Sequence, residues 1–334
     1  MRPLFTLETT MVTLLLLLCF AVPIVNAEGL VFRWTPPTTE YLHALSMVSP
    51  SDGWAVGGDG AIIHWNGTDW SNVTSPTNDA LYDVAMVNAN DGWAVGNYGT
   101  MIRWNGTSWN YVTTAPTIIL WSVFMLNSDD GWAVGYGGII IHWNGTNWSP
   151  VTSPTGITLT NVFMVNTTLG WAIESTGAIY RWNGTSWNNI PSPTSAFLRS
   201  VDMVDAENGW IVGNSGTIIH WNGTTWSNAT SPTQTTLLSV NVLNANDGCA
   251  VGYDGTIIHW NGTSWNNVTS PTTKTLWDVF IVDTDDAWIV GDKGTILRWI
   301  GTSWIPELSS LIILPLFIAL MLLAVIVHHR KHFT

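Results

Sequence analysis

The sequence predicts an all-β fold, a seven-bladed β-propeller of four-stranded blades, followed by a C-terminal transmembrane helix. Three observations predict the propeller: one motif recurs seven times, its spacing is a constant 39 residues, and no repeat contains a helical pattern. The motif is Asp-Gly-Trp-Ala-Val-Gly at 52–57, and its copies are aligned by Trp54, Trp93, Trp132, Trp171, Trp210, Cys249 and Trp288. Such a repeat buries its apolar faces by stacking on its neighbours, so one closed domain is expected.

The repeat at residues 81–117 shows how four strands fit into this spacing. Asp91-Gly92 and Asn105-Gly106 are hairpin turns, a glycine-containing turn lies between them, and Pro116 breaks the sheet before the next repeat. The expected strands are Val84–Val87, Trp93–Val95, Thr100–Trp104 and Ser108–Thr113.

Blades that pack face to face bury both faces of their sheets, which explains why strands such as Gly255–Trp260 are apolar almost throughout. Most of the 23 Trp residues are expected in this packing. Residues 30–35 align with a fourth strand although they precede the first complete repeat. We therefore expect this segment to pair with the last blade as its outermost strand and to close the ring.

The amino-terminal end has the features of an export signal. Arg2 precedes an apolar run that ends in Val25-Asn26-Ala27, with small or branched residues where a signal peptidase reads. Residues 1–27 are therefore predicted to be a signal peptide, and residues 28–305 the mature propeller. One cysteine, Cys249, then remains, so packing rather than a disulfide must hold the domain.

Residues 306–327 are predicted to form a transmembrane or sorting-signal helix. Leu308–Val327 contains twenty residues without a charge, enough at about 1.5 Å per residue to cross the ~30 Å hydrocarbon core. The basic tail, residues 328–334, is expected in the cytoplasm and the propeller outside, which gives a single-pass protein of the cell surface.

The expected outer domain is strongly acidic. The chain has ten Lys and Arg against 23 Asp and Glu, and seven against 22 remain without Arg2, Glu8, Arg330 and Lys331. A net charge of about −15 repels nucleic acid and anionic lipid, so no nucleic-acid partner is expected.

Each repeat runs from Asp-Gly-Trp-Ala-Val-Gly to Gly-Thr-Ile-Ile-His-Trp-Asn-Gly-Thr-Ser-Trp, with small variations, over residues 30–305. This pattern resembles the repeats of the photosystem II assembly-factor propellers, near the Asp-box, or sialidase-like, repeats. The resemblance implies the propeller fold. An Asp-box has Asp before Gly-x-x-Trp, whereas the turn at 66–70 is one residue shorter.

The C-terminal end carries a second resemblance. Ile305-Pro306-Glu307-Leu308, an apolar segment and a basic cluster follow one another. This order is similar to the Pro-Glu-Phe sorting signals that archaeosortases and exosortases recognise, with Leu308 in place of Phe. The resemblance implies that the helix is removed and the protein anchored otherwise; the alternative is a plain transmembrane anchor.

Asn-x-Ser/Thr sequons recur on the predicted turns. In an exported chain they are candidate glycan acceptors, although duplication of one Asn-Gly-Thr turn also multiplies sequons without any modification. The candidates are Asn66, Asn72, Asn105, Asn144, Asn147, Asn166, Asn183, Asn222, Asn228, Asn261 and Asn267.

Two further polar series have structural interpretations. The third strands carry His64, Arg103, His142, Arg181, His220, His259 and Arg298. The third strand of each blade lies about 9.6 Å outside the innermost strand. Equivalent side chains of neighbouring blades are then too far apart to bind one metal ion, which needs its ligand atoms at about 2.1 Å. We therefore expect these side chains to pack beside Trp. The first-turn residues Asp52, Asp91, Asp130, Asp247 and Asp286 are expected to bond to amides of their own turns. No metal, cofactor or catalytic residue is predicted, and Cys249 is interpreted as a buried replacement for Trp.

Positions that vary on a repeated scaffold are better candidates for ligand contact. One such series begins each first strand: His43, Tyr82, Trp121, Thr160, Arg199, Leu238 and Trp277, with Asp83 and Asp278 adjacent. We expect it to ring one mouth of the central channel, where aromatic and carboxylate groups would contact a sugar or peptide. The alternative is drift between copies. The predicted ligand-binding residues are His43, Tyr82, Asp83, Trp121, Arg199, Trp277 and Asp278.

Three classes of function remain open. The first is a membrane-anchored surface module for binding, adhesion or scaffolding, whose partner is an unknown glycan or protein. The second, which the photosystem relatives suggest, is an assembly factor for a membrane complex. The third, a sialidase-type glycosidase, needs an arginine cluster, so no enzyme is expected: the mature domain has only Arg33, Arg103, Arg181, Arg199 and Arg298.

Overall fold

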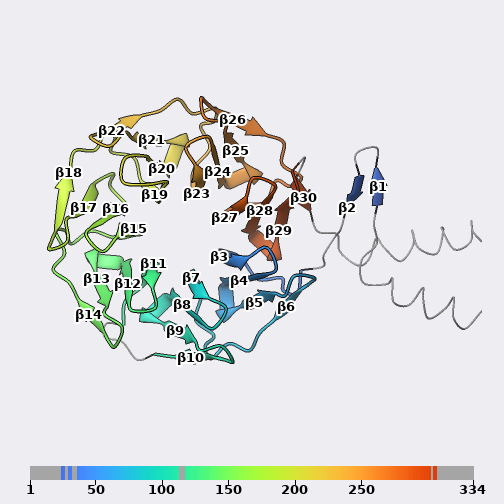
Figure 1. Ribbon diagram of the computed structural model, residues 1–334, viewed down its shortest axis with the longest axis horizontal. Helices are drawn as coiled ribbons and strands as arrows, with labels where there is room; N and C mark the ends of the chain where they lie inside the picture. Colours follow the sequence, from blue (N-terminus) through green and yellow to red (C-terminus); the bar gives the residue numbers. More distant parts are fainter. Residues whose placement is uncertain (1–23, 27–28, 32–35, 113–116, 302–303, 307–334) are drawn as a thin grey trace, which may run out of the picture. The chain divides into compact units, whose positions relative to one another are not determined.

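The computed structural model describes residues 24–26, 29–31, 36–112, 117–301 and 304–306. Seven four-stranded antiparallel sheets stand in a ring, each with its first strand nearest the centre (Figure 1). This arrangement confirms the predicted seven-bladed β-propeller. β1 (Ile24–Asn26) and β2 (Gly29–Val31) pair in a separate two-stranded sheet.

Within every blade the strands follow one another in sequence order. The first strands are β3 (Leu42–Ser49), β7 (Leu81–Asn88), β11 (Leu120–Asn127), β15 (Leu159–Asn166), β19 (Leu198–Met203), β23 (Leu237–Asn244) and β27 (Leu276–Asp283). The second strands are β4 (Asp52–Gly57), β8 (Asp91–Gly96), β12 (Asp130–Gly135), β16 (Leu169–Glu174), β20 (Gly209–Gly213), β24 (Asp247–Gly252) and β28 (Asp286–Gly291).

The outer half of each blade is built from shorter strands. The third strands are β5 (Ile62–Trp65), β9 (Met101–Trp104), β13 (Ile140–Trp143), β17 (Ile179–Trp182), β21 (Ile218–Trp221), β25 (Ile257–Trp260) and β29 (Ile296–Trp299). The fourth strands are β6 (Trp70–Asn72), β10 (Trp109–Tyr111), β14 (Trp148–Pro150), β18 (Trp187–Ile190), β22 (Trp226–Asn228), β26 (Trp265–Val268) and β30 (Trp304–Pro306).

Short 3₁₀ turns join the second and third strands in six blades: η1 (Gly58–Gly60), η2 (Asn97–Gly99), η3 (Tyr136–Gly138), η4 (Asn214–Gly216), η5 (Tyr253–Gly255) and η6 (Asp292–Gly294). The last residue of the turn must be glycine. Gly60 has φ +67°, and a Cβ atom there would lie 2.1 Å from the carbonyl oxygen of Thr77. A left-handed backbone and a close approach together exclude a side chain.

Indole rings fill the junctions between neighbouring blades. Trp54 on β4 is buried, and its ring centroid lies 4.6 Å from that of Trp104 and 5.5 Å from that of Trp109 on the next blade. The equivalent arrangement begins at Trp93, Trp132, Trp171, Trp210 and Trp288. Such pairs contribute about 0.5–1.5 kcal/mol each beyond area burial, and they confirm the predicted packing role of the Trp rows.

Among the described residues the ring closes without an exchanged strand, so the prediction that residues 30–35 complete the last blade is wrong. The last sheet has the order β27-β28-β29-β30, so its fourth strand is formed by Trp304–Pro306 in the position that the prediction gave to residues 30–35. Residues 29–31 pair with β1 instead, and residues 32–35 lie outside the described residues. Closure rests on ordinary junction contacts, including Trp288 against Trp65 with centroids 4.9 Å apart.

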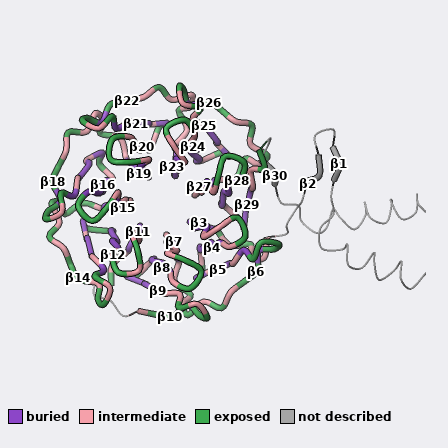
Figure 2. Tube along the Cα trace, in the orientation of Figure 1, coloured by how far each residue is buried: buried purple, intermediate pink, exposed green. Residues whose placement is uncertain are grey.

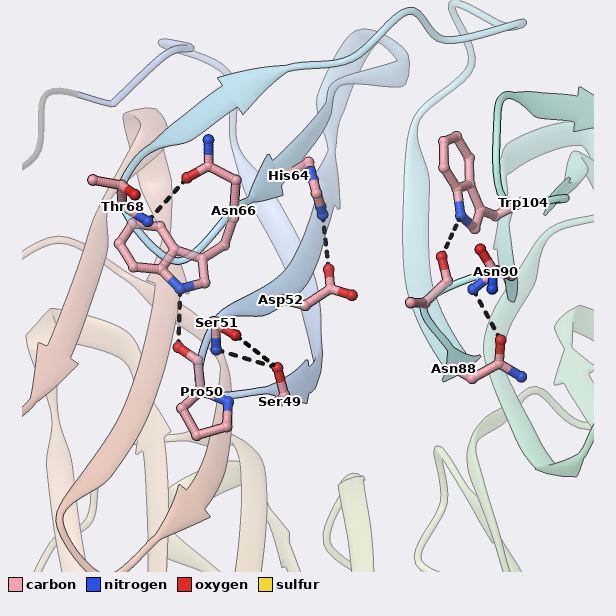
Figure 3. A network of polar contacts seen from close by, with 12 residues as sticks. Ser49, Pro50, Ser51, Asp52, His64, Asn66, Thr68, Asn88, Asn90 and Trp104 are labelled. Carbon is pink, nitrogen blue, oxygen red and sulfur yellow. Dashed lines mark hydrogen bonds and ion pairs between the residues drawn. The ribbon is translucent and has the colours of Figure 1, made fainter.

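The outer polar series form pairs with one another (Figure 3). The His64 Nε2 atom lies 2.7 Å from Oδ1 of Asp52, and Arg103 donates to both oxygens of Asp91. The expectation that these Asp residues bond to their own turn amides is therefore wrong: residues at the end of the first strand, such as Asn88, accept those amides. The basic side chains also stack on indoles, as His64 does on Trp54 with centroids 4.2 Å apart, so their packing role is confirmed.

Buried residues concentrate on the second and third strands of each blade, while the turns and the fourth strands carry most exposed residues (Figure 2). The predicted signal peptide, apart from residues 24–26, and nearly all of the predicted C-terminal helix and tail lie outside the described residues. Within the described ranges, no helix has the length and apolar character required to span a bilayer.

Candidate functional site

A cavity of about 580 Å³ lies at one mouth of the ring. The register pairs the start of each first strand with the end of the second, for example Leu42 with Gly57, so that strand starts and the turns η1–η6 share this mouth. All seven predicted ligand-binding residues line the cavity: His43, Tyr82, Asp83, Trp121, Arg199, Trp277 and Asp278. The structure thus brings the predicted set together, and ligand contact by these residues stays a prediction.

Aromatic side chains form a continuous arc along one side of the cavity. The ring centroids of Trp277 and His43 are 5.5 Å apart, those of His43 and Tyr82 are 5.4 Å apart, and those of Tyr82 and Trp121 are 4.5 Å apart. The arc therefore crosses four blades. Burial lowers the pKa of His43, whose Nδ1 atom lies 2.8 Å from the carbonyl oxygen of Leu81, so the ring is neutral at pH 7.

A single cation completes the lining away from the arc. Arg199 packs its guanidinium 4.0 Å from the ring centroid of Phe197 and donates through Nε to Oδ1 of Asn214 at 3.0 Å. Its burial lowers its pKa, and the side chain forms no ion pair among the described residues. Thr160 and Leu238 occupy the equivalent positions on the flanking blades, so the lining is aromatic on one side and mixed polar on the other.

In Asp83 and Asp278, the two carboxylates among the predicted ligand-binding residues, both oxygens accept hydrogen bonds from the protein itself. Asp278 accepts the amide of Leu45 at 2.9 Å and the hydroxyl of Ser239 at 2.6 Å, which links three blades. Asp83 accepts the amide of Val123 at 2.9 Å in the same way. Burial raises the pKa of Asp278 to about 6 and that of Asp83 to about 7. Their first role is therefore to join the inner strands.

Sequence reasoning missed that these carboxylates belong to a repeated series of acceptors. Ser122, Asn161 and Ser200 stand at the same repeat position as Asp83, and each accepts an inner-strand amide of the next blade. Asp202 does the same two residues further along, with the amide of Val242 at 2.7 Å, and burial raises its pKa to about 7. The signal was present in the sequence, because six of the seven residues at the first position can accept a hydrogen bond.

The turns around the mouth hold residues in left-handed conformations. Five of these are not glycine: Asp59, Tyr98, Ser215, Asp254 and Lys293. Such conformations cost about 1 kcal/mol or more and concentrate at functional loops. Two tyrosines are also presented to solvent here, Tyr98 at 66 % exposure and Tyr136 at 59 %. The aromatic surface therefore continues outward from the cavity over the turns η2 and η3.

No family model matches the chain, and no curated protein does. Solved structures match over most of the ring. A structure of YCF48 bound to a D1 peptide is 20 % identical, covers 84 % of this chain and 98 % of its own, and gives a TM-score of 0.67. YCF48 from Cyanidioschyzon merolae is 18 % identical, with coverages of 80 % and 98 % and a TM-score of 0.68. The WD40 propeller of Doa1 is 13 % identical, with coverages of 78 % and 93 % and a TM-score of 0.67.

These likenesses agree with the predicted resemblance to the photosystem II assembly-factor propellers at the level of fold. They do not test the Asp-box relation or the sorting signal, and both stay predictions. Within the described residues, no three His, Cys, Asp or Glu side chains lie close enough together to hold a metal ion.

All eleven sequon asparagines are exposed. Those that begin the outer hairpin turns use the side-chain oxygen within the turn, as when Oδ1 of Asn66 accepts the amide of Thr68 at 2.9 Å (Figure 3). The same oxygen accepts the amide of Asp69 at 2.9 Å. Asn72 instead donates through Nδ2 to the carbonyl oxygen of Pro37 at 2.7 Å. The turn asparagines therefore keep the nitrogen that a glycan would modify outside these bonds, and glycosylation remains a prediction.

Proposed function

We propose that this chain is a recognition module that binds a segment of a partner protein at the aromatic mouth of the ring. The observation that carries the proposal is the arc from Trp277 to Trp121, which faces a cavity also lined by Arg199. Large aromatic side chains and arginine dominate binding energy at protein interfaces. A rigid scaffold that presents them in one concave surface suits binding without chemical change of the ligand.

A protein segment is favoured over a glycan for two reasons. Tyr136 at the edge of the cavity and the exposed Tyr98 on η2 extend the aromatic surface from the arc over two neighbouring turns, which suits a ligand of several residues. YCF48, which shares the fold, has been solved with a D1 peptide. A role as an assembly factor for a membrane complex is one form of this proposal. Glycan recognition by stacking on Trp121 or Trp277 is the second candidate.

The location and the lack of catalysis belong to the same proposal. The predicted export signal and the predicted anchor or sorting signal support an extracellular module held at the membrane. A site that combines an aromatic arc with small polar groups, and in which both oxygens of Asp83 and Asp278 accept backbone hydrogen bonds, supports binding rather than turnover.

Photo-crosslinking in cells tests the proposal directly. A photoreactive p-benzoylphenylalanine in place of Tyr136 samples the mouth, and the same residue in place of Tyr111, which is 52 % exposed on β10, samples the rim. We expect protein adducts specific to position 136, identified by mass spectrometry. Replacing Trp121 by Ala should reduce those adducts, since loss of such an anchor costs about 2 kcal/mol, roughly 30-fold in affinity.

Three outcomes separate the candidates. Adducts specific to position 136 that Trp121→Ala removes support a protein ligand. Saturable binding on a glycan array, lost in Trp121→Ala and without protein adducts, supports the second candidate. Equal adducts from positions 136 and 111, or binding unchanged by Trp121→Ala and Trp277→Ala in folded protein, would place the interaction elsewhere.

A further inference from the structure

A second cavity, of about 450 Å³, lies between the sixth and seventh blades, away from the channel mouth. It is lined by Cys249 and His259 of the sixth blade and by Ile281, Ala287 and Trp299 of the seventh. Exposed turn residues, among them Asn246 and Asp283, stand at its edge, so solvent reaches it. Its volume falls within the range of about 300–1,000 Å³ that small-molecule sites occupy.

The other six junctions show what this space normally holds. At each of them a Trp on the second strand of one blade packs against two indoles of the next, as Trp54 does against Trp104 and Trp109. In three blades that Trp also lies on a histidine of its own blade, with ring centroids 4.2–4.3 Å apart. The indole is therefore held between an imidazole and the facing blade.

The sixth blade keeps this frame but lacks the indole. Cys249 pairs in register with His259 as Trp54 pairs with His64, so the side chain points into the same slot. His259 holds its usual position, with Nε2 at 2.8 Å from Oδ1 of Asp247. Trp299 contacts the same apolar cluster from the facing blade. The junction has thus lost an aromatic ring and has retained the groups that flank it.

We propose that this cavity binds a planar aromatic molecule the size of indole. The ligand would stack on His259 and contact Ile281 and Ala287, replacing the covalent indole of the other junctions. A cavity left by a deleted side chain in an otherwise rigid core takes up apolar aromatic ligands of matching shape, since the lining does not collapse fully. Asn246 and Asp283 at the edge offer acceptors for a ring N–H group.

The thiol of Cys249 has no chemical part in this proposal. Burial raises the pKa of that thiol, and the side chain is 4 % exposed. Thiolate chemistry requires the opposite environment. Cys249 matters because its side chain is small and leaves the cavity open.

Titration of the full-length protein with indole tests the inference, by ligand-observed NMR together with thermal melting. We expect saturable binding with a Kd below about 1 mM and a rise in melting temperature with indole concentration. Cys249→Trp should weaken binding more than tenfold and raise the melting temperature of the free protein. Cys249→Ala is the matched control and should retain binding, because it leaves the cavity open.

Two further variants separate this cavity from the rest of the ring. Trp121→Ala alters the aromatic mouth, so binding of indole that survives in this variant belongs to the second cavity. Trp210→Cys recreates the sixth-junction slot in the fifth blade and should be stabilised by indole more than the wild type is. Absence of saturable binding by the wild type, or equal binding by folded Cys249→Trp, would overturn the inference.

Discussion

Replacement of Asp278 by Asn should make the stability of the propeller less dependent on pH. The Asp278 carboxyl group is buried and accepts hydrogen bonds from Leu45 on one side and Ser239 on the other. Asn161 stands at the same repeat position, where Oδ1 accepts the amide of Val201 and Nδ2 donates to Ser122. An amide at position 278 can therefore accept the Leu45 amide through its oxygen and donate to Ser239 through Nδ2 without a titratable group. It gives up only the bond in which Oδ1 of Asp278 accepts the amide of Val279, and that loss is the same at every pH.

The magnitude follows from the raised pKa of the Asp278 carboxyl. Burial raises it from 3.8 to about 6, so the folded state keeps a proton that the unfolded state has released between these values. The free energy of unfolding then falls as pH rises through this window and levels off above it. The full difference is about 3 kcal/mol at 1.36 kcal/mol per pH unit, of which about 2 kcal/mol falls between pH 4.5 and pH 8.

Denaturant unfolding of wild type and Asp278→Asn at several pH values measures this difference. The change in unfolding free energy between pH 4.5 and pH 8 should be about 2 kcal/mol smaller in magnitude for the variant. Burial lowers the pKa of His43 and opposes the trend, but it does so in both proteins. Asp69→Asn, in an exposed turn, is the control and should follow the wild type. Parallel profiles for wild type and Asp278→Asn would refute the reasoning.

Three other changes have defined outcomes. Trp132→Ala should lower the free energy of unfolding by about 3–5 kcal/mol in denaturant titrations, because it empties a packed junction. Tyr180→Phe removes a hydroxyl that donates at 2.7 Å to the buried Glu174, and should cost about 1.5–3 kcal/mol by the same measurement. Thr68→Ala should remove any glycan at Asn66, seen by mass spectrometry of that peptide, without loss of the turn, since Asn66 accepts backbone amides there.

The fold could be predicted because the repeat is strict. A constant spacing fixes the number of blades, and turn residues such as Asn105-Gly106 divide each repeat into strands. The positions of Trp93 and Trp104 were sufficient to assign them to the junctions. The repeat also predicts that the residues at the start of each first strand lie at one mouth, because equivalent positions of the seven blades lie at the same height along the axis of a closed ring.

Contacts between blades were harder to predict, because they depend on the offset between adjacent inner strands. Asp83 accepts the amide of Val123, 40 residues later rather than 39, and the repeat alone does not give that extra residue. The pairing of Asp52 with His64 likewise depends on which second-strand and third-strand residues face each other, while turn chemistry alone favours a local bond.

The error about closure has a physical cause that applies to repeat propellers generally. An exchanged strand strengthens a seam where the last junction differs from the others. Here the junction from the seventh blade to the first repeats the others: Trp288 lies against Trp65 and Trp70, and Asp278 accepts the amide of Leu45. A closing junction that has the same contacts as the other junctions needs no exchanged strand. The junction that does differ is the one between the sixth and seventh blades, where Cys249 replaces the indole side chain of the other junctions. The missing indole leaves a cavity for a ligand and does not affect the closing junction.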